Sequence, residues 1–217
     1  MADGSAERGR LVVVSAPSGT GKSTVCRALV ERRDDVAVSI SYTTRPPRGD
    51  ERDGREYHFV DDATFDAMIA AGAFLEWAPV HGRRYGTARA DVEALRARGC
   101  DVLFDIDVQG GQQIKRAEPE ARLVFILPPS MDELVRRLTG RGTETPAQVA
   151  ARLRTAVWEL EQGADYDCWL VNDSVERAVA ELDGLRRAAI DRAQMRDRRQ
   201  LLEALLTEAR RRLAATC

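Results

Sequence analysis

The sequence lacks long apolar runs, and its first residues predict no secretory leader. None of its apolar runs approaches the roughly 20 residues that a membrane-spanning helix requires. The first ten residues, MADGSAERGR, are polar, and no apolar stretch of signal-peptide length follows them. We therefore expect a cytoplasmic protein with no membrane partner.

Cysteine and histidine are scarce, with four and two residues respectively. The cysteines, Cys26, Cys100, Cys168 and Cys217, are far apart in the sequence and form no CxxC pair. Because a zinc site combines closely spaced cysteines and histidines, these residues argue against the common zinc-binding classes. We expect free thiols in a reducing compartment.

A basic excess is also absent, since 33 lysine and arginine residues face 35 aspartate and glutamate residues, for a net charge of −2. Proteins that bind nucleic acid generally carry a strong positive excess, so we expect no nucleic-acid partner. Only Lys22 and Lys115 are lysine, and arginine supplies the remaining positive charge. The composition is that of an ordinary globular protein, and 217 residues suffice for one core with inserted subdomains.

What the chain does contain is a series of short apolar runs. They are LVVVSA (11–16), CDVLFDIDV (100–108), ARLVFIL (121–127) and CWLVN (168–172). Continuous apolar runs of this length are typical of strands that are buried on both faces of a parallel sheet. Helical patterns separate them, which predicts an α/β fold with a parallel sheet.

Two segments interrupt this alternation. Residues 39–90 are rich in glycine, arginine and tyrosine, and they predict a small mixed α/β insertion. Residues 136–156 carry glycines and a proline among arginines, which predicts a short polar flap after a helix that begins at a capping box, Ser130 to Glu133. We therefore divide the chain into a core, residues 1–38, 92–131 and 157–217, an inserted subdomain, 39–91, and a helical lid, 132–156.

The segment SAPSGTGKST, residues 15–24, lies between the first apolar run and a helical pattern. It matches the loop that binds phosphate in P-loop NTPases, except that Ala16 replaces the first glycine. The backbone N–H groups of such a loop, at the start of a helix, form an anion site. The alternative is a glycine-rich turn without a ligand. The strand-to-helix context favours a nucleotide site, and with it a three-layer core of the P-loop NTPase type.

The side chains of this loop suit phosphate binding. Gly19 and Gly21 allow the tight turn. Lys22 supplies a mobile charge for the outer phosphates, and Ser23 offers a hydroxyl to Mg²⁺. We therefore expect the loop to bind a nucleoside triphosphate through Ala16, Pro17, Ser18, Gly19, Thr20, Gly21, Lys22, Ser23 and Thr24.

The insertion offers a second anion site. Arg45 and Arg48 flank Pro46 and Pro47, and two guanidinium groups held by a stiff backbone can bind one phosphate. The alternative is a solvated surface turn, which is the commoner role of arginine pairs.

Nine segments together resemble the guanylate kinase family of the bacterial kind, whose members phosphorylate GMP to GDP with ATP. They are SAPSGTGKST, SYTTRPPRG, EYHFV, FLEW, VHG..YGT, DIDVQG, LPPS, GRGTET and VND. They follow the family's order between residue 11 and about residue 183. The resemblance implies ATP as co-substrate, Mg²⁺ as cofactor, GMP and dGMP as acceptors, and a place in purine nucleotide metabolism.

The chemistry of guanine explains several of these residues. Guanine offers donors at N1 and N2 and acceptors at O6 and N7. Glu76 can accept from both donors, and Asp107 can accept a second bond from N2. The hydroxyls of Ser41 and Thr87 can donate to O6. Adenine has an acceptor at N1 and would leave Glu76 unpaired, which predicts discrimination against AMP. Taken alone, Glu76 would usually be a surface charge.

The resemblance assigns the acceptor phosphate to Arg45, Arg48, Tyr57 and Tyr85. Taken alone, either tyrosine would more often be a half-buried core residue with its hydroxyl satisfied. Their occurrence together, at the spacing of the family, favours a GMP site.

Phosphoryl transfer needs in-line positioning and neutralisation of charge. The resemblance implies five catalytic cations, which are Lys22, Arg45 and the lid residues Arg137, Arg141 and Arg152. Arg137 and Arg141 are one helical turn apart, so they can face one ligand, although a solvated basic helix is the alternative. Closure of the subdomain and the lid would exclude water from the reaction.

Two further residues complete the expected site. Asp105 follows the second apolar run, and we expect it to organise Mg²⁺ through water, together with Ser23. A capping carboxylate is the alternative for Asp105. Asn172, in the VND segment, is expected near the adenine of ATP.

The chain departs from the family before Tyr85, where Arg83 and Arg84 replace an Asn-Tyr or similar pair. This departure predicts extra positive charge near the acceptor phosphate. At the C-terminal end, Leu202, Leu206, Ala209 and Leu213 share a helical face. That face either packs on the core or mediates a homo-oligomer, so monomer and homo-oligomer both stay open.

Two other functions stay open at this point. A guanylate-kinase-like binding module keeps the GMP-binding shape but lacks the phosphate loop, and the presence of Lys22 and Ser23 argues against it. A related kinase for a sugar phosphate would lack the guanine-reading residues, and the presence of Glu76 and Thr87 argues against that.

Overall fold

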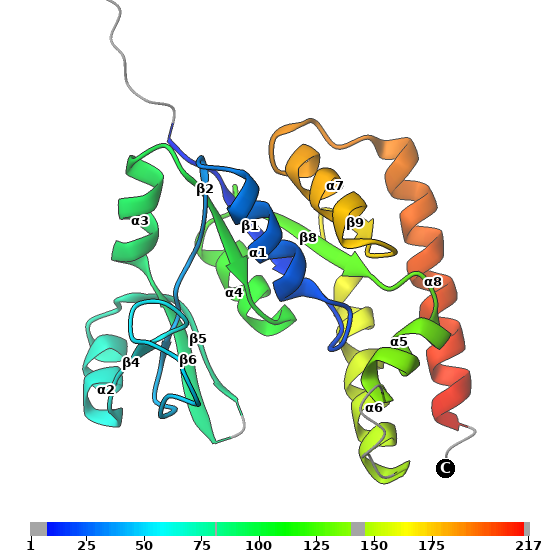
Figure 1. The fold of residues 1–217 in the computed structure, drawn as a ribbon, viewed down its shortest axis with the longest axis horizontal. Helices are drawn as coiled ribbons and strands as arrows, with labels where there is room; N and C mark the ends of the chain where they lie inside the picture. The colour runs from blue at the N-terminus through cyan, green and yellow to red at the C-terminus, as the bar shows by residue number, and fades with distance from the viewer. Residues whose placement is uncertain (1–7, 81, 140–145, 215–217) are drawn as a thin grey trace, which may run out of the picture.

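The computed structural model describes residues 8–80, 82–139 and 146–214. Its core is a five-stranded parallel sheet with the strand order β2-β7-β1-β8-β9 (Figure 1). The strands are β1 (Leu11–Ser15), β2 (Val36–Val38), β7 (Asp101–Asp105), β8 (Arg122–Leu127) and β9 (Cys168–Val171). The predicted α/β fold with a parallel sheet is confirmed.

Strand β1 lies at the centre of the sheet, and all five of its residues are buried there. It pairs in parallel with β7 on one side and β8 on the other. The four predicted apolar runs form β1, β7, β8 and β9. Strand β2 was not predicted from the sequence. Its three residues are too few to show a periodic pattern of apolar side chains, and the strand is defined by its pairing with β7.

Helices cover both faces of this sheet. The crossover through α1 (Lys22–Arg32) leads from β1 to β2, whereas those through α4 (Val108–Ala117) and α6 (Pro146–Gly163) lead in the opposite direction along the sheet. Since parallel crossovers are right-handed, α1 lies on one face and α4 and α6 on the other. Helix α7 (Val175–Arg187) packs on α1, and α3 (Arg89–Ala97) packs on β7. The three-layer arrangement follows.

A second, mixed sheet has the order β4-β3-β6-β5 and lies at the lower left in Figure 1. Its strands are β3 (Tyr42–Thr43), β4 (His58–Phe59), β5 (Phe74–Val80) and β6 (Arg83–Ala88). Helix α2 (Asp62–Ala70) is capped by Asp61, whose side chain accepts from the Thr64 N–H at 2.7 Å. Its Phe65 is fully buried, with its ring 4.6 Å from that of Phe74. All of these elements lie within the predicted insertion.

The predicted lid contains all but the first residue of one helix and the first part of another. Helix α5 (Met131–Thr139) begins beside Ser130, whose hydroxyl accepts from the Glu133 N–H at 3.2 Å. Helix α6 runs without a break through the boundary that we drew after residue 156. Leu153, Ala156 and Leu160 are all buried along α6, so one apolar face joins the two predicted parts. Residues 140–145 lie outside the described part of the chain.

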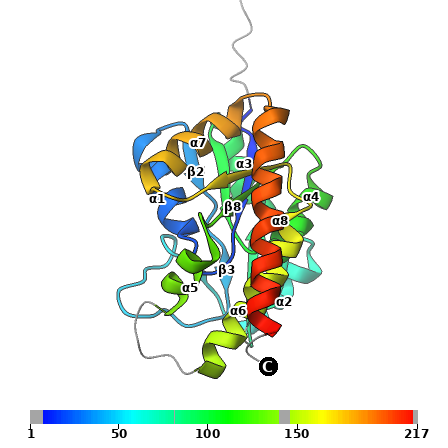
Figure 2. The same ribbon diagram turned by 90° about the vertical axis from the view of Figure 1, so that its right-hand side faces the viewer.

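The long helix α8 (Arg192–Ala214) runs along one side of the molecule (Figure 2). Leu202 and Ala209 are buried against the core, and Leu206 and Leu213 are half-buried and pack on it. Packing on the core is therefore the observed use of this face. Within the described ranges, no helix combines the length and the apolar character that crossing a membrane requires.

Candidate active site

The phosphate loop joins the end of β1 to the start of α1 and surrounds a cavity of about 470 Å³. Gly19 and Gly21 have φ angles of 85° and 92°, in the left-handed region that favours glycine. A Cβ atom at Gly21 would lie 2.7 Å from Asn172 Nδ2, so both backbone angle and space require glycine there. Ala16, which replaces the usual first glycine, is buried at the start of the loop and lines the same cavity.

Contacts from distant segments hold this loop. The Asn172 side chain donates to the Thr20 carbonyl at 2.7 Å. Arg137, on α5, donates to the same carbonyl at 3.1 Å and to the Asn172 carbonyl at 3.2 Å. On the opposite side of the loop, the Ser18 N–H donates to Glu159 Oε2 at 3.1 Å. The loop thus has a fixed shape in which α5 and α6 both take part.

Lys22 lies where the core sheet meets the second sheet. Its Nζ donates to the Ile106 carbonyl at 2.6 Å and lies 2.8 Å from Asp105 Oδ1. Both side chains are about one-fifth exposed. Asp105 is therefore an ion-pair partner of the loop lysine, at the carboxyl end of β7.

A second cavity, of about 270 Å³, opens beside Lys22. The predicted acceptor residues that line it are Ser41, Tyr57, Glu76, Tyr85 and Asp107. Lys22 and Asp107 line this acceptor cavity and the phosphate cavity alike. The two cavities therefore adjoin, and the fold brings residues from β1–α1, β7–α4 and the second sheet to their junction.

Glu76, on β5, is buried, with 6% of its surface exposed. Burial raises the pKa of this carboxyl to about 7, the hydrogen bond from Thr87 opposes the rise, and the nearby Asp107 charge adds to it. Helix α4 approaches closely, since a Cβ atom at Gly110 would lie 3.1 Å from Glu76 Oε2. A carboxyl in this setting changes its charge within the physiological range of pH.

Thr87 differs from its prediction. It is buried, and its hydroxyl donates to Glu76 Oε1 at 2.7 Å. Because this bond uses its proton, Thr87 cannot also donate to O6 of guanine. Ser41, whose Oγ lies 3.5 Å from Thr87 Oγ1, lines the acceptor cavity and keeps that chemistry available.

The arginine pair is not held together as we predicted. Arg45 is buried, and its guanidinium binds both carboxylate oxygens of Glu51 at 2.8 and 2.9 Å. Its Cζ lies 5.1 Å from the centre of the Tyr57 ring, which lines the acceptor cavity. Arg48 is exposed, and its backbone N–H donates to Glu51 at 2.8 Å. Glu51 thus takes the place between the two arginines that the prediction gave to a phosphate.

The lid arginines have different positions. Arg137 contacts the back of the phosphate loop and also pairs with Glu133, with 2.6 Å between Nε and Oε1. Arg152, at the outside of α6, donates to the Leu138 carbonyl at 2.9 Å. Arg141 lies outside the described residues. Among the described residues, the structure therefore places Arg137 at the loop and Arg152 against the end of α5.

Neither Arg83 nor Arg84 lines the acceptor cavity. The Arg84 guanidinium is bonded to Asp62 and Asp66 of α2 and lies 4.9 Å from the Phe65 ring. It therefore ties β6 to α2. Arg83 is exposed, with a long contact of 3.4 Å to the Thr44 carbonyl.

Sequence reasoning missed Glu51 and Glu159, two of the carboxylates that contact predicted phosphate-binding groups. Glu159 lines the phosphate cavity, and burial raises its pKa, while the Ser18 N–H and Lys22 oppose the rise. Glu159 sits in an ordinary helical stretch 141 residues from Ser18, so no local pattern could identify it. Glu51 lies six residues from Arg45, and its charge in the stretch RGDER gave a weak signal at best.

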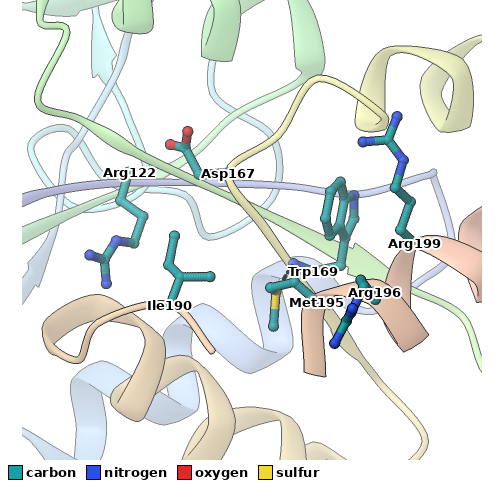
Figure 3. Close-up of a pocket in the computed structure, with 7 residues that line it drawn as sticks. All are labelled: Arg122, Asp167, Trp169, Ile190, Met195, Arg196 and Arg199. Atoms are coloured by element: carbon teal, nitrogen blue, oxygen red, sulfur yellow. Dashed lines mark hydrogen bonds between the residues drawn. The ribbon is translucent and has the colours of Figure 1, made fainter. Parts of the chain in front are cut away.

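A further cavity, of about 540 Å³, lies beside β8, β9 and the start of α8 (Figure 3). Trp169 and Met195 line it together with Arg122 and Asp167. Arg122 donates to the Ala188 carbonyl at 2.7 Å, and Asp167 pairs with Lys115 at 3.0 Å. Arg122 and Asp167 thus serve the fold, and none of the predicted site residues lines this cavity. The adjoining pair of cavities at Lys22 is the candidate active site.

Comparisons of the whole chain with known proteins agree with one another. Residues 8–189 match the family model described as guanylate kinase. The guanylate kinase of Sphingopyxis alaskensis is 53% identical over 182 residues, which cover 83% of this chain and 83% of that protein. That of Thermobifida fusca is 53% identical over 173 residues, covering 80% and 88% respectively. The solved structure of guanylate kinase from Anaplasma phagocytophilum is similar with a TM-score of 0.67 and 32% identity, over 83% of this chain and 86% of that one.

Proposed function

Because this chain belongs to the guanylate kinase family and is an ATP:GMP phosphotransferase, we propose that the phosphoryl group passes between its two adjoining cavities. The observation that carries this proposal is the shared wall of the cavities, Lys22 and Asp107. An anion held by the loop and an anion held by the acceptor residues would meet at Lys22. In-line transfer requires that arrangement of donor and acceptor.

The phosphate loop is the proposed site of the ATP phosphates. Its N–H groups at the start of α1 and the charge of Lys22 attract an anion. On binding, Lys22 would exchange Asp105 for a phosphate oxygen. Asn172, which holds Thr20, would support the loop from one side. On that side another cavity, of about 320 Å³, offers space for the rest of ATP.

Ser23 and Asp105 are the residues that would hold Mg²⁺. Ser23 is exposed in the phosphate cavity, and the Asp105 carboxylate lies beside Lys22. Hydroxyl and carboxylate oxygens suit this ion, which commonly takes one or two protein ligands together with substrate phosphates and water. Among the described residues, no three acidic, histidine or cysteine side chains form a metal cluster of their own. Bound Mg²⁺ would neutralise charge on the phosphates.

Glu76 is the proposed reader of guanine, as the acceptor for N1–H and N2–H. Thr87 holds this carboxylate, Asp107 takes a second bond from N2, and Ser41 donates to O6. The same groups make no contact with the 2′ position in this proposal, so dGMP is a substrate as well. The acceptor phosphate would lie at Arg45, Tyr57 and Tyr85, with Arg48 closing over it from the exposed turn.

The lid would complete the site. Arg137, Arg141 and Arg152 are the proposed cations that gather around the phosphates when ATP and GMP are both bound. In the cell, we place this reaction in the cytoplasm and in purine nucleotide metabolism. The packed C-terminal helix α8 supports a monomer, because its apolar face is already covered by the core.

A coupled assay of ADP release tests this function, with GMP, dGMP, AMP, CMP and UMP as acceptors. We expect turnover with GMP and dGMP, and a preference over AMP of at least about 10²-fold in kcat/KM, because AMP leaves the buried Glu76 without a partner. Equal turnover of GMP and AMP would contradict the role of Glu76. A binding module would release no ADP with any acceptor.

A further inference from the structure

The environment of Arg45 shows how its guanidinium is oriented. Its Nη1 donates to Glu51 Oε2 at 2.8 Å and to the Pro46 carbonyl at 2.9 Å, and its Nη2 donates to Glu51 Oε1 at 2.9 Å. Glu51 therefore binds the end of the guanidinium with both oxygens. The Arg45 side chain is 7% exposed and that of Glu51 is 23% exposed.

A count of the N–H groups of Arg45 shows which of them bond to neither Glu51 nor Pro46. A guanidinium has five N–H groups in one plane. The three bonds to Glu51 and Pro46 involve both N–H groups of Nη1 and one of Nη2. The other two, on Nε and Nη2, lie side by side on the adjacent edge of the planar group. Such a pair is the geometry with which arginine binds two oxygens of a phosphate.

The aromatic neighbours fix the plane of this guanidinium. Its Cζ lies 5.1 Å from the centre of the Tyr57 ring and 5.8 Å from that of Phe59. Hydrogen bonding to Glu51, and to a lesser extent to Tyr85, raises the pKa of Arg45. Tyr57 and Tyr85 both line the acceptor cavity. The Arg45 guanidinium therefore adjoins two residues that line the acceptor cavity.

We propose that Glu51 is a positioning residue for the acceptor phosphate, which holds one edge of Arg45 so that the second edge, Nε–H and Nη2–H, faces the phosphate of GMP. This inference rests on the proposed function and adds to it a residue that touches neither substrate. It also explains why the Arg48 backbone is bonded to Glu51, since that bond fixes the carboxylate in turn.

The direction in which GMP affinity changes when Glu51 loses its charge distinguishes positioning from simple electrostatics. Removing a negative charge next to a phosphate site should strengthen phosphate binding if charge alone matters. Positioning predicts the opposite, because a released Arg45 would spread over several rotamers and lose its aligned edge. The isosteric substitution Glu51→Gln therefore gives results of opposite sign in the two cases.

The test is calorimetric binding of GMP and of guanosine, which lacks the phosphate, to the full-length wild type and to Glu51→Gln. We expect GMP affinity to fall by about tenfold or more, the loss of about one charge-assisted hydrogen bond, while guanosine affinity stays within about twofold. Retained guanosine binding shows that the variant is folded. Unchanged or tighter GMP binding by Glu51→Gln would overturn the proposal.

A double-mutant cycle with Arg45→Ala shows whether Glu51 acts through Arg45. We expect Glu51→Gln to have no further effect on GMP affinity in the Arg45→Ala background. An equal effect in both backgrounds would overturn the positioning role. Glu56→Gln is the matched control, because Glu56 lies on the same connection between β3 and β4 and accepts from the Arg52 N–H at 2.8 Å without contacting Arg45 in the described structure. If the wild type binds GMP no more tightly than guanosine, the proposed function itself fails, whatever the variants do.

Discussion

At the scale of single residues, Glu76 shows how the fold gives a common side chain an unusual property. The sequence singled out Glu76 through the segment FLEW and the chemistry of guanine. It could not show that burial raises the pKa of this carboxyl to about 7, since that burial depends on the approach of α4, and the hydrogen bond from Thr87 only partly opposes it. The proposed reader of guanine thus titrates near neutral pH in the free enzyme.

This titration leads to a pH dependence. Because the ionised form accepts from N1–H and N2–H, kcat/KM for GMP should rise with pH up to about 7 and level off above it. Below that pH the carboxyl is protonated in the free enzyme and loses an acceptor site. Steady-state kinetics between pH 5.5 and 9 check this expectation.

The control for this profile is Glu76→Gln, which removes the titrating group and keeps the shape. We expect its kcat/KM for GMP to be lower than that of the wild type and flat through pH 7. The same inflection in both proteins would assign the titration to another group. Discrimination against AMP should also be lost in this variant, because an amide pairs with either purine.

At the scale of elements, the junction of the phosphate loop and α1 depends on Gly21. Its φ of 92° is costly for alanine, and the added Cβ would meet Asn172 Nδ2 at 2.7 Å. Gly21→Ala should therefore lower stability by about 1–3 kcal/mol and raise KM for ATP. Urea denaturation and steady-state kinetics measure the two effects.

Gly72→Ala is the matched control for this substitution. Gly72 also has a left-handed φ, 63°, but a Cβ atom there would meet nothing within 4 Å. The control therefore carries backbone strain without the contact to Asn172. If Gly72→Ala raised KM for ATP as much as Gly21→Ala, the contact at the loop would have no special role.

Helix α5 supports the same loop through Arg137. Arg137→Ala removes the two bonds to the Thr20 and Asn172 carbonyls, so we expect KM for ATP to rise by about tenfold with little change in KM for GMP. The adjacent Arg136 is the control, since it also pairs with Glu133 but points outward, with 72% of its side chain exposed. Arg136→Ala should leave both constants within about twofold of the wild type. Equal effects of the two substitutions would show that Arg137 acts only through general charge.

At the scale of the whole molecule, the core sheet could be predicted from the sequence, and the second sheet could not be predicted in detail. The apolar runs of β1, β7, β8 and β9 are fully or almost fully buried on both faces, so composition alone identifies them. Strands β3 and β4 have two residues each and are defined by their pairing partners. A periodic pattern cannot exist over so short a length.

The candidate site, too, could be predicted only in part from local segments of the sequence. The residues that bear its chemistry, such as Lys22 and Glu76, carry local signals in the phosphate loop and in FLEW. The contacts that hold Lys22 and its loop join distant residues. Lys22 and Ile106 are 84 positions apart, and Thr20 and Asn172 are 152 positions apart. Those partners are set by the order of the strands in the sheet, and no single segment of sequence contains that information.

The central claim is that Lys22 stands between the two cavities and serves the transfer. The most direct measurement compares GMP binding with phosphoryl transfer in Lys22→Met, which keeps the apolar stem and removes the charge. We predict that transfer from ATP falls by at least about 10³-fold while the Kd for GMP stays within about threefold of the wild type. Substantial transfer by Lys22→Met, in a protein that still binds GMP, would contradict the account.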